Sequence, residues 1–289
     1  MQKQVLAIHD LSCVGRCSLT VALPILSACG VHTSALPTAL LSTHTGEFTG
    51  YTYMDLSGEM RAIADHFATL PLQFDGVYSG FLGSFEQIRL VGEVIRRYRH
   101  PDGLTLVDPV MADHGRLYAT YTREMAAGMG ELCRLADVIV PNLTEACILL
   151  DRPYDPCPEE RQVKDLLEAL AVKFGCGQVI ITGVRQGDQL GTGGFCAADG
   201  TFSFHGAKHL DRVFYGTGDS FASALMGAML CGKSTGDAIR IAVDFTHAAM
   251  CHTIDNGLPL RYGVAFEQAL PMLMRALGLT DDHAGANEP

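Results

Sequence analysis

Residues 216–234 read GTGDSFASALMGAMLCGKS and contain two glycine patterns of the kind that bind phosphate. The first is Gly-Thr-Gly-Asp, at residues 216–219. The second runs from Gly227 to Ser234 and matches G-x-x-x-x-G-K-S, the P-loop of nucleotide-binding proteins. The two patterns need different folds around them, so their contexts decide which fold this half of the chain adopts.

The context of residues 227–234 argues against a P-loop, which needs a strand before it and a helix after it. Apolar residues instead recur at helical spacing through the first half of the pattern. They are Phe221, Ala224, Leu225, Ala228 and Met229. That spacing predicts a helix with one apolar face. We expect Gly232 to end this helix, with Lys233 at its negative pole.

The end of the P-loop match has the features of a second helix start. Ser234 and Asp237 have the spacing of a capping box. The apolar face of the helix that follows includes Ile239, Ala242, Val243 and Thr246. We therefore interpret residues 227–234 as a helix end followed by a helix start.

Residues 216–219 have the context that phosphate binding requires. Two glycines just before a helix let free N–H groups approach an anion at the positive end of the helix dipole. Asp219 is open to two interpretations. It is either a carboxylate that only stabilises the helix start, or a base that takes the proton of a hydroxyl attacking a γ-phosphate.

The rest of the chain alternates short apolar runs with helical patterns. Buried strands are predicted at residues 4–8, 76–80, 104–109, 137–142 and 178–183. Helices are predicted after the first strand up to Gly30, from about Ser84 to Arg99 and from about Pro158 to Phe174. This alternation predicts an α/β fold with a mostly parallel sheet and helices on both faces.

The C-terminal part departs from this alternation. Glycines and the pair Asp199-Gly200 predict a β-hairpin at residues 188–206, and the chain then looks helical to about Leu277. We expect one domain, residues 1–280, followed by a polar tail at 281–289. Ten cysteines are scattered through apolar segments, and we expect them to be reduced and mostly buried.

Composition restricts the kind of partner. A net charge of -11 and 48% apolar residues indicate a globular acidic protein rather than one that binds nucleic acid. The longest apolar stretches are well short of the roughly 20 residues of a membrane-spanning helix. No signal sequence precedes the first strand, so we expect a cytoplasmic protein that acts on a small molecule without membrane contact.

Polar residues follow the predicted strands where ligands bind in open α/β sheets, outside the carboxyl ends. These clusters are His9-Asp10, Asp108-Pro109 and Asn142, with Glu145 one helical turn later. There is no lysine near Gly216 to offset phosphate charge, so Mg²⁺ held by oxygen ligands or their bound waters must supply much of the positive charge. Asp108 and Glu145 suit that role, although helix capping or loop solvation would also explain them.

These motifs resemble the ribokinase-like superfamily, and within it the pyridoxal/pyridoxamine kinases, with hydroxymethylpyrimidine kinases as near relatives. The resemblance runs from about residue 4 to 275. Its matching stretches are LAIHDLSCVGRCS, LSTHTGEFTGY, SGFLGS, DPVMAD, PNLTEA and GTGDSFAS. It implies a three-layer α/β/α kinase that uses ATP and Mg²⁺ in pyridoxal phosphate salvage, with a homodimer and a monovalent cation such as K⁺ as further family traits.

The resemblance also implies site residues. Asp219 corresponds to the catalytic base, and the backbone of Gly216, Thr217 and Gly218 to an anion hole. Substrate contacts fall on Asp10, His44, Thr45 and Phe81. The ATP region falls on Asn142, Thr182 and Asp113, the metal on Asp108 and Glu145, and a flap on Ala112 to about Thr122.

Three departures concern substrate choice. Many relatives have serine at the position of Asp10, and a carboxylate there could pair with a pyridine nitrogen or an amine and favour pyridoxamine. Phe81 lacks the hydroxyl of the usual tyrosine, and the flap has no cysteine. His44 either shapes the pocket or satisfies a loop carbonyl.

Two other functions remain open for this chain. One is a hydroxymethylpyrimidine kinase, and the other is a silent ligand-binding protein of the same fold.

Overall fold

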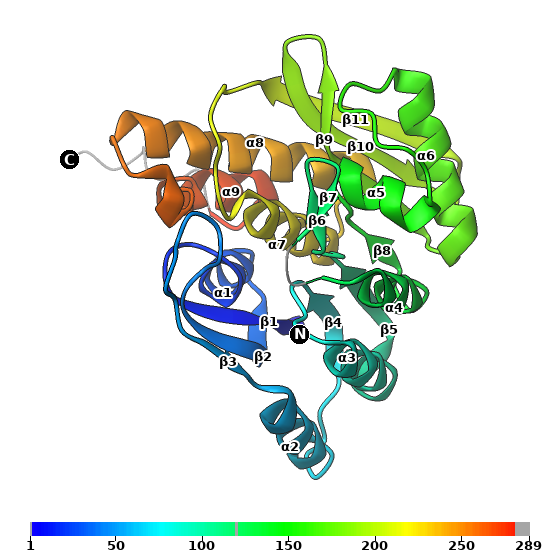
Figure 1. The fold of residues 1–289 in the computed structure, drawn as a ribbon, viewed down its shortest axis with the longest axis vertical. Helices are drawn as coiled ribbons and strands as arrows, with labels where there is room; N and C mark the ends of the chain where they lie inside the picture. Colours follow the sequence, from blue (N-terminus) through cyan, green and yellow to red (C-terminus); the bar gives the residue numbers. More distant parts are fainter. Residues whose placement is uncertain (1, 119–120, 281–289) are drawn as a thin grey trace, which may run out of the picture.

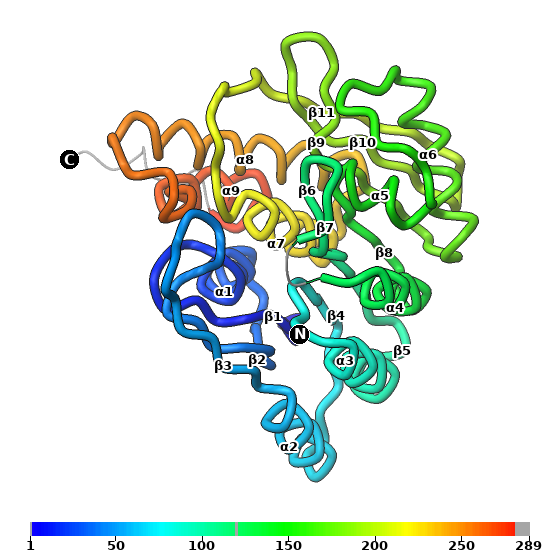
Figure 2. The backbone as a smooth tube through the Cα atoms, viewed as in Figure 1, coloured from blue at the N-terminus to red at the C-terminus, as the bar shows by residue number. Residues whose placement is uncertain are grey.

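A nine-stranded sheet forms the centre of the computed structural model, which describes residues 2–118 and 121–280 (Figure 1). Its strand order is β11-β10-β9-β8-β5-β4-β1-β2-β3. The strands are β1 (Gln4–Val14), β2 (His32–Thr43), β3 (Tyr53–Asp55), β4 (Phe74–Ser79), β5 (Arg99–Val107), β8 (Val138–Ile139), β9 (Gln178–Gln186), β10 (Gln189–Cys196) and β11 (Thr201–Lys208). Its edge strands, β11 and β3, lie at opposite ends of the molecule (Figure 2).

The sheet is parallel from β2 to β9, and its antiparallel pairs are β2–β3, β9–β10 and β10–β11. The expected mostly parallel sheet and the C-terminal hairpin are therefore confirmed. The hairpin turns at Asp199-Gly200, where Gly200 has a positive φ of 69° and Asp199 accepts a hydrogen bond from the N–H of Thr201. A second, two-stranded sheet joins β6 (Ala112–Asp113) to β7 (Arg116–Leu117).

Helices cover both faces, as the strand-helix alternation predicts. They are α1 (Leu19–Ala28), α2 (Ser57–Phe67), α3 (Phe85–Tyr98), α4 (Arg123–Cys133), α5 (Leu143–Leu150), α6 (Glu160–Phe174), α7 (Thr217–Leu230), α8 (Thr235–Asp255) and α9 (Leu270–Leu277), with 3₁₀ turns at Leu260–Tyr262 and Phe266–Gln268. Helices α1, α7, α8 and α9 contribute to one apolar core, and α2 to α6 to the other. Strand side chains alternate between the two cores, so the fold has three layers, α/β/α.

The junction of α7 and α8 confirms that the P-loop match is a helix end. The N–H of Gly232 donates to the carbonyl of Met229, and the N–H of Lys233 donates to that of Ala228, which together form a Schellman motif. Ser234 caps α8 by accepting from the N–H of Asp237 at 3.2 Å. The capping box is only half formed, because the carboxylate of Asp237 accepts from the Ser234 hydroxyl rather than from its backbone.

Several strand boundaries differ from the sequence prediction, and the end of β1 is the one that matters for the site. Strand β1 does not stop at residue 8 but continues to Val14, with a register shift between His9 and Leu11 against β2. The polar residues at its end stay in the strand because Asp10 and Ser12 find hydrogen-bond partners within the fold. Active-site loops therefore begin later than expected.

Other expectations have mixed outcomes. All ten cysteines are free thiols, and five of them are buried. Within residues 2–118 and 121–280, no helix is both long and apolar enough to cross a membrane. The predicted polar tail and residues 119–120 of the expected flap lie outside the described residues.

Candidate active site

The parallel strands bring polar residues together at their carboxyl ends. Ile8 of β1 pairs with Ser79 of β4, so Asp10 and Phe81 each lie two residues beyond that pair. Val107 of β5 pairs with both Ser79 and Ile139 of β8, which places Asp108 and Asn142 at the same edge. The sequence clusters therefore meet at the site where open α/β sheets bind ligands.

The start of α7 faces this edge and is built to leave its N–H groups open. Gly216 precedes the helix with a φ of 71°, and a Cβ there would clash with the carbonyl oxygen of Arg16. Gly218 faces open space, since an added Cβ would meet no heavy atom within 4 Å. No described residue accepts a hydrogen bond from the N–H groups of Thr217 or Gly218. The first turn of α7 is therefore suited to an anion.

Asp219 lies in this first turn and is held by one hydrogen bond. Its Oδ2 accepts from the backbone N–H of Ser18 at 2.8 Å, and no described residue donates to its Oδ1. The residue keeps some solvent exposure. Poor hydration of the carboxylate, together with the nearby charge of Asp10, raises the pKa of Asp219 to about 6. A carboxylate of that basicity suits a general base.

Asp10 is buried beside Asp219 and is engaged by two hydroxyl groups. Its Oδ1 accepts from Ser18 at 2.5 Å and its Oδ2 from Ser12 at 3.2 Å. Burial raises the pKa of Asp10, and the two hydroxyls oppose that rise. Asp10, which is expected to face the substrate, therefore also accepts a hydrogen bond from Ser18 in the loop before α1.

Ser18 is a site residue that was not expected from the sequence. It has a φ of 57° and a ψ of -129°, a conformation that non-glycine residues rarely adopt and that costs about 1–3 kcal/mol. Its partners are remote in sequence, since Asp219 is 201 residues away. A single serine in a sequence carries no signal of either property.

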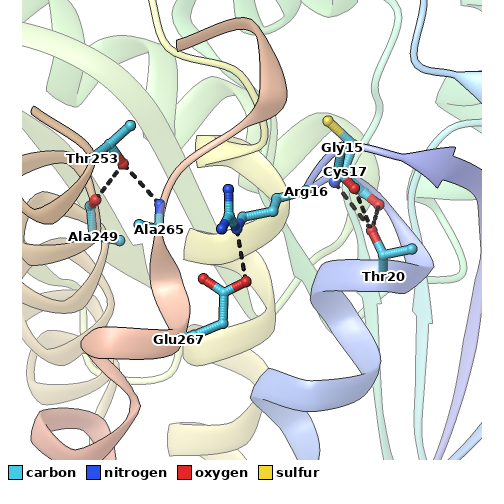
Figure 3. Close-up of polar contacts among 8 residues, drawn as sticks. All are labelled: Gly15, Arg16, Cys17, Thr20, Ala249, Thr253, Ala265 and Glu267. Carbon is cyan, nitrogen blue, oxygen red and sulfur yellow. Dashed lines mark hydrogen bonds and ion pairs between the residues drawn. The ribbon is translucent and has the colours of Figure 1, made fainter. Parts of the chain in front are cut away.

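The loop before Ser18 is anchored on both sides (Figure 3). Thr20 accepts from the N–H of Cys17 at 3.3 Å and donates to its carbonyl at 2.7 Å. Arg16 pairs with Glu267 at 2.7 Å, and its N–H donates to the carbonyl of Tyr262. Thr253 in turn ties α8 to the segment carrying Glu267, because it accepts from the N–H of Ala265 at 2.8 Å. The loop is therefore fixed to the C-terminal helices.

Asp108 and Glu145 form a second acidic pair. Asp108 is 8% exposed, and burial together with the charges of Glu145 and Asp219 raises its pKa well above the usual range. Burial raises the pKa of Glu145 to about 7, although three backbone N–H groups, of Met111, Ala112 and Asn142, oppose the rise by donating to it. Glu145 lies one turn into α5 rather than at a strand end.

The residues expected near ATP are partly connected. Asn142 caps α5 and its amide donates to the carbonyl of Ala112 at 2.8 Å. It also forms a parallel bridge with Thr182 of β9. Asp113, at the tip of the β6–β7 hairpin, is exposed and accepts from the N–H of His114. Asn142 and Thr182 thus lie side by side, whereas Asp113 extends from the hairpin above α5.

The other three residues expected to contact the substrate, His44, Thr45 and Phe81, have different environments. His44 accepts from the N–H of Gly46 through Nδ1 and donates through Nε2 to the carbonyl of Arg261 at 2.5 Å. It therefore satisfies a loop carbonyl, one of its two proposed roles, and it also packs against Tyr215, just before Gly216. Thr45 is exposed beside it, and Phe81 is half-buried with its ring 6.3 Å from that of Tyr121.

Of the two predicted Mg²⁺ ligands, Asp108 fits the role better than Glu145. Residues 2–118 and 121–280 hold no group of three or more His, Cys, Asp or Glu side chains arranged to bind a metal. Mg²⁺ in kinases is commonly held by one or two carboxylates together with phosphates and water. Asp108 fits, because no described residue donates to its carboxylate. Glu145 fits less well as a direct ligand, because backbone N–H groups occupy both of its oxygens.

An open helix start with a carboxylate in its first turn, at the carboxyl edge of a parallel sheet, is the arrangement expected of a phosphotransferase. Comparison with known proteins gives the particular group. The chain belongs to the phosphomethylpyrimidine kinase family, whose model matches residues 23–261. It is a kinase of the phosphomethylpyrimidine and pyridoxal kinase type, which confirms the resemblance drawn from its motifs.

Relatives carry names of both activities. A pyridoxine/pyridoxal/pyridoxamine kinase of Bordetella avium is 27% identical over 270 residues, which are 86% of this chain and 85% of that one. The pyridoxal kinase of Lactobacillus plantarum is 32% identical, with a TM-score of 0.88 over 95% of this chain and 98% of that one. A Bacteroides thetaiotaomicron protein, provisionally described as a phosphomethylpyrimidine kinase and crystallised with pyridoxal, is 37% identical, with a TM-score of 0.90 over 94% and 96%.

Neutralising Asp108 is expected to stabilise the fold. Because its pKa is raised by folding, the stabilising contribution of its protonated form is complete below the unfolded pKa and is lost as the pH rises toward the folded pKa. Asp108→Asn should therefore raise the free energy of unfolding at pH 8, measured without divalent ions. The gain at pH 5 should be smaller.

Urea denaturation at both pH values measures this effect. Asp113→Asn is the matched control, because that carboxylate is exposed, and we expect its change to stay within about 0.5 kcal/mol. An Asp108→Asn variant that is equally destabilised at pH 5 and pH 8 would contradict the assignment of Asp108 as an uncompensated buried acid.

Proposed function

We propose that this protein phosphorylates the 5′-hydroxymethyl group of a vitamin B6 vitamer with ATP, in pyridoxal phosphate salvage. The observation that carries the proposal is the position of Asp219. It is a carboxylate of raised pKa in the first turn of α7, next to N–H groups that no described residue uses. A carboxylate beside an anion site weakens anion binding by repulsion. Its position there is explained if it accepts a proton in the reaction.

Asp219 acts as the general base in this scheme. Its Oδ1 accepts the proton as the vitamer oxygen bonds to the γ-phosphorus and the bond to the β-phosphate oxygen breaks, releasing ADP. The N–H groups of Gly216, Thr217 and Gly218 take up the phosphate charge as an anion hole. Proton transfer and charge stabilisation thus come from four consecutive residues.

A metal ion and the residues near the nucleotide are proposed to neutralise the rest of the phosphate charge. Asp108 would hold Mg²⁺ as a carboxylate ligand, with Glu145 as the second candidate, and the bound ion would supply positive charge for the phosphates. Asn142 and Thr182 flank the nucleotide phosphates, and Asp113 lies at the hairpin over them. A monovalent cation such as K⁺ is part of the family expectation.

Substrate recognition is proposed for the other end of the site. Phe81 stacks on the pyridine ring, and Thr45, presented by the loop that His44 fixes, contacts its substituents. The relative solved with pyridoxal supports a vitamer as the acceptor. The family name equally supports hydroxymethylpyrimidine, which needs the same phosphate machinery and a different ring pocket. A homodimer and a cytoplasmic location remain expectations of the same family.

The Asp219→Asn variant tests the mechanism. The amide keeps the size of the side chain but cannot accept the proton, so kcat should fall by about 10² to 10⁴-fold. In the wild-type enzyme, kcat/KM should fall as the pH drops below about 6, where Asp219 becomes protonated. ADP release is measured with pyridoxal, pyridoxamine, pyridoxine and hydroxymethylpyrimidine.

The four acceptors separate the alternatives. Turnover with hydroxymethylpyrimidine alone would assign the protein to thiamine synthesis, and turnover with none of them would indicate a silent binding protein. Turnover of Asp219→Asn close to that of the wild type would contradict the mechanism. Unchanged circular dichroism of the variant is the control for folding.

Asp10 gives a prediction about vitamer choice. If its carboxylate pairs with the amine of pyridoxamine or with the ring nitrogen, Asp10→Ser should shift the ratio of kcat/KM values toward pyridoxal. The ratio is the measured quantity, since a general loss of activity cancels in it. An unchanged ratio would exclude Asp10 from substrate selection.

A further inference from the structure

We propose that Ser18 is a positioning residue that ties the base Asp219 to the buried carboxylate of Asp10, so that the three residues work as one unit. The inference rests on the proposed function of Asp219 and adds to it a partner outside α7. Neither Ser18 nor its bonds follow from the GTGD motif.

The geometry of Ser18 connects the two acids directly. Its backbone N–H donates to Oδ2 of Asp219 at 2.8 Å, and its hydroxyl donates to Oδ1 of Asp10 at 2.5 Å. One oxygen of the base is therefore fixed, and its Oδ1 stays available for the substrate proton. Ser18 thus donates to both carboxylates, through its N–H to Asp219 and through its neutral hydroxyl to Asp10.

The backbone of Ser18 can hold this position only because its surroundings impose it. Ser18 has a φ of 57°, and its N–H donates to Asp219 of α7. The carbonyl of Ser18 accepts from the N–H groups of Val21 and Ala22 in α1. The anchors at Thr20 and Arg16 fix the residues around it (Figure 3). The bond to Asp10 is the only hydrogen bond recorded for the Ser18 hydroxyl among the described residues.

The charge of Asp10 gives the unit an effect on proton affinity. The titratable groups near Asp219 are Asp10 of β1, Cys17 of the loop, Tyr78 of β4, Asp108 after β5 and Tyr118 after β7. Burial raises the pKa of Cys17, Tyr78 and Tyr118, which keeps these groups neutral. The charge of Asp10 thus raises the pKa of Asp219, and the Ser18 hydroxyl favours the charged form of Asp10 by donating to it, against the effect of burial.

Two variants separate the hydroxyl from the charge. Asp10→Asn keeps an oxygen that can accept from Ser18 and removes the charge, while Ser18→Ala removes the hydroxyl and keeps the backbone N–H. Ser12→Ala is the matched control, because Ser12 donates to the same carboxylate but does not touch Asp219. Each is made in the full chain labelled with ¹³C at the aspartate carboxyl carbons, and the Asp219 signal is assigned with Asp219→Asn.

The midpoint of the Asp219 titration is the decisive readout. Asp10→Asn should lower it by at least about half a pH unit. Ser18→Ala should also lower it, because Asp10 without that hydroxyl holds its proton to higher pH. Ser18→Ala should in addition reduce kcat roughly tenfold, with the KM values within about twofold. Ser12→Ala should lower the midpoint less than Ser18→Ala, because the Ser12 bond to Asp10 is the longer of the two, 3.2 Å against 2.5 Å, and it should leave kcat close to that of the wild type.

The outcomes distinguish this inference from the proposed function. Midpoints that do not move in Asp10→Asn and Ser18→Ala, or that move equally in Ser12→Ala, would overturn the Ser18 link even in an active kinase. Midpoints that move as expected in a protein that phosphorylates none of the four acceptors would support the link and refute the kinase assignment. A purely structural role of Ser18 would lower the unfolding temperature of Ser18→Ala without moving the midpoint.

Discussion

The site depends on one constraint: it gathers four acidic side chains, and none of them forms an ion pair with a cationic side chain among the described residues. Asp10, Asp108, Glu145 and Asp219 gather at the carboxyl edge of the sheet, and no ion pair recorded for the described part of the chain involves any of them. What opposes their charge is a set of N–H groups and hydroxyls from the start of α7, the turn before α5 and the loop before α1. Such a site is complete only when a substrate and a cation enter it.

The same constraint explains which residues of the site lower the stability of the fold. Ser18 holds an uncommon backbone conformation, and Asp108 is buried without a donor among the described residues. Both would be easy to relieve by substitution, and both lie at the residues proposed for catalysis. The two large apolar cores on either face of the sheet offset these local costs.

The fold was largely predictable because its signals are local. Helical spacing at Phe221 to Met229 and the glycine at 232 were enough to reject the P-loop, and strand-helix alternation gave the parallel sheet. The end of β1 was not predictable, since Asp10 and Ser12 stay in the strand through partners that only the fold supplies. The site residues followed from motifs, but their contacts did not. The bond from Ser18 to Asp219 spans 201 residues, and the carbonyl that His44 satisfies lies 217 residues away.

The central claim is that the first turn of α7 binds phosphate and presents Asp219 to the acceptor. A crystal structure with ADP, Mg²⁺ and a B6 vitamer tests it most directly. The account predicts phosphate oxygens within hydrogen-bonding distance of the N–H groups at 216–218, and the 5′-oxygen about 2.6–3.2 Å from Oδ1 of Asp219. Phosphates bound at Gly232–Ser234, or a vitamer whose 5′-oxygen lies away from Asp219, would contradict it.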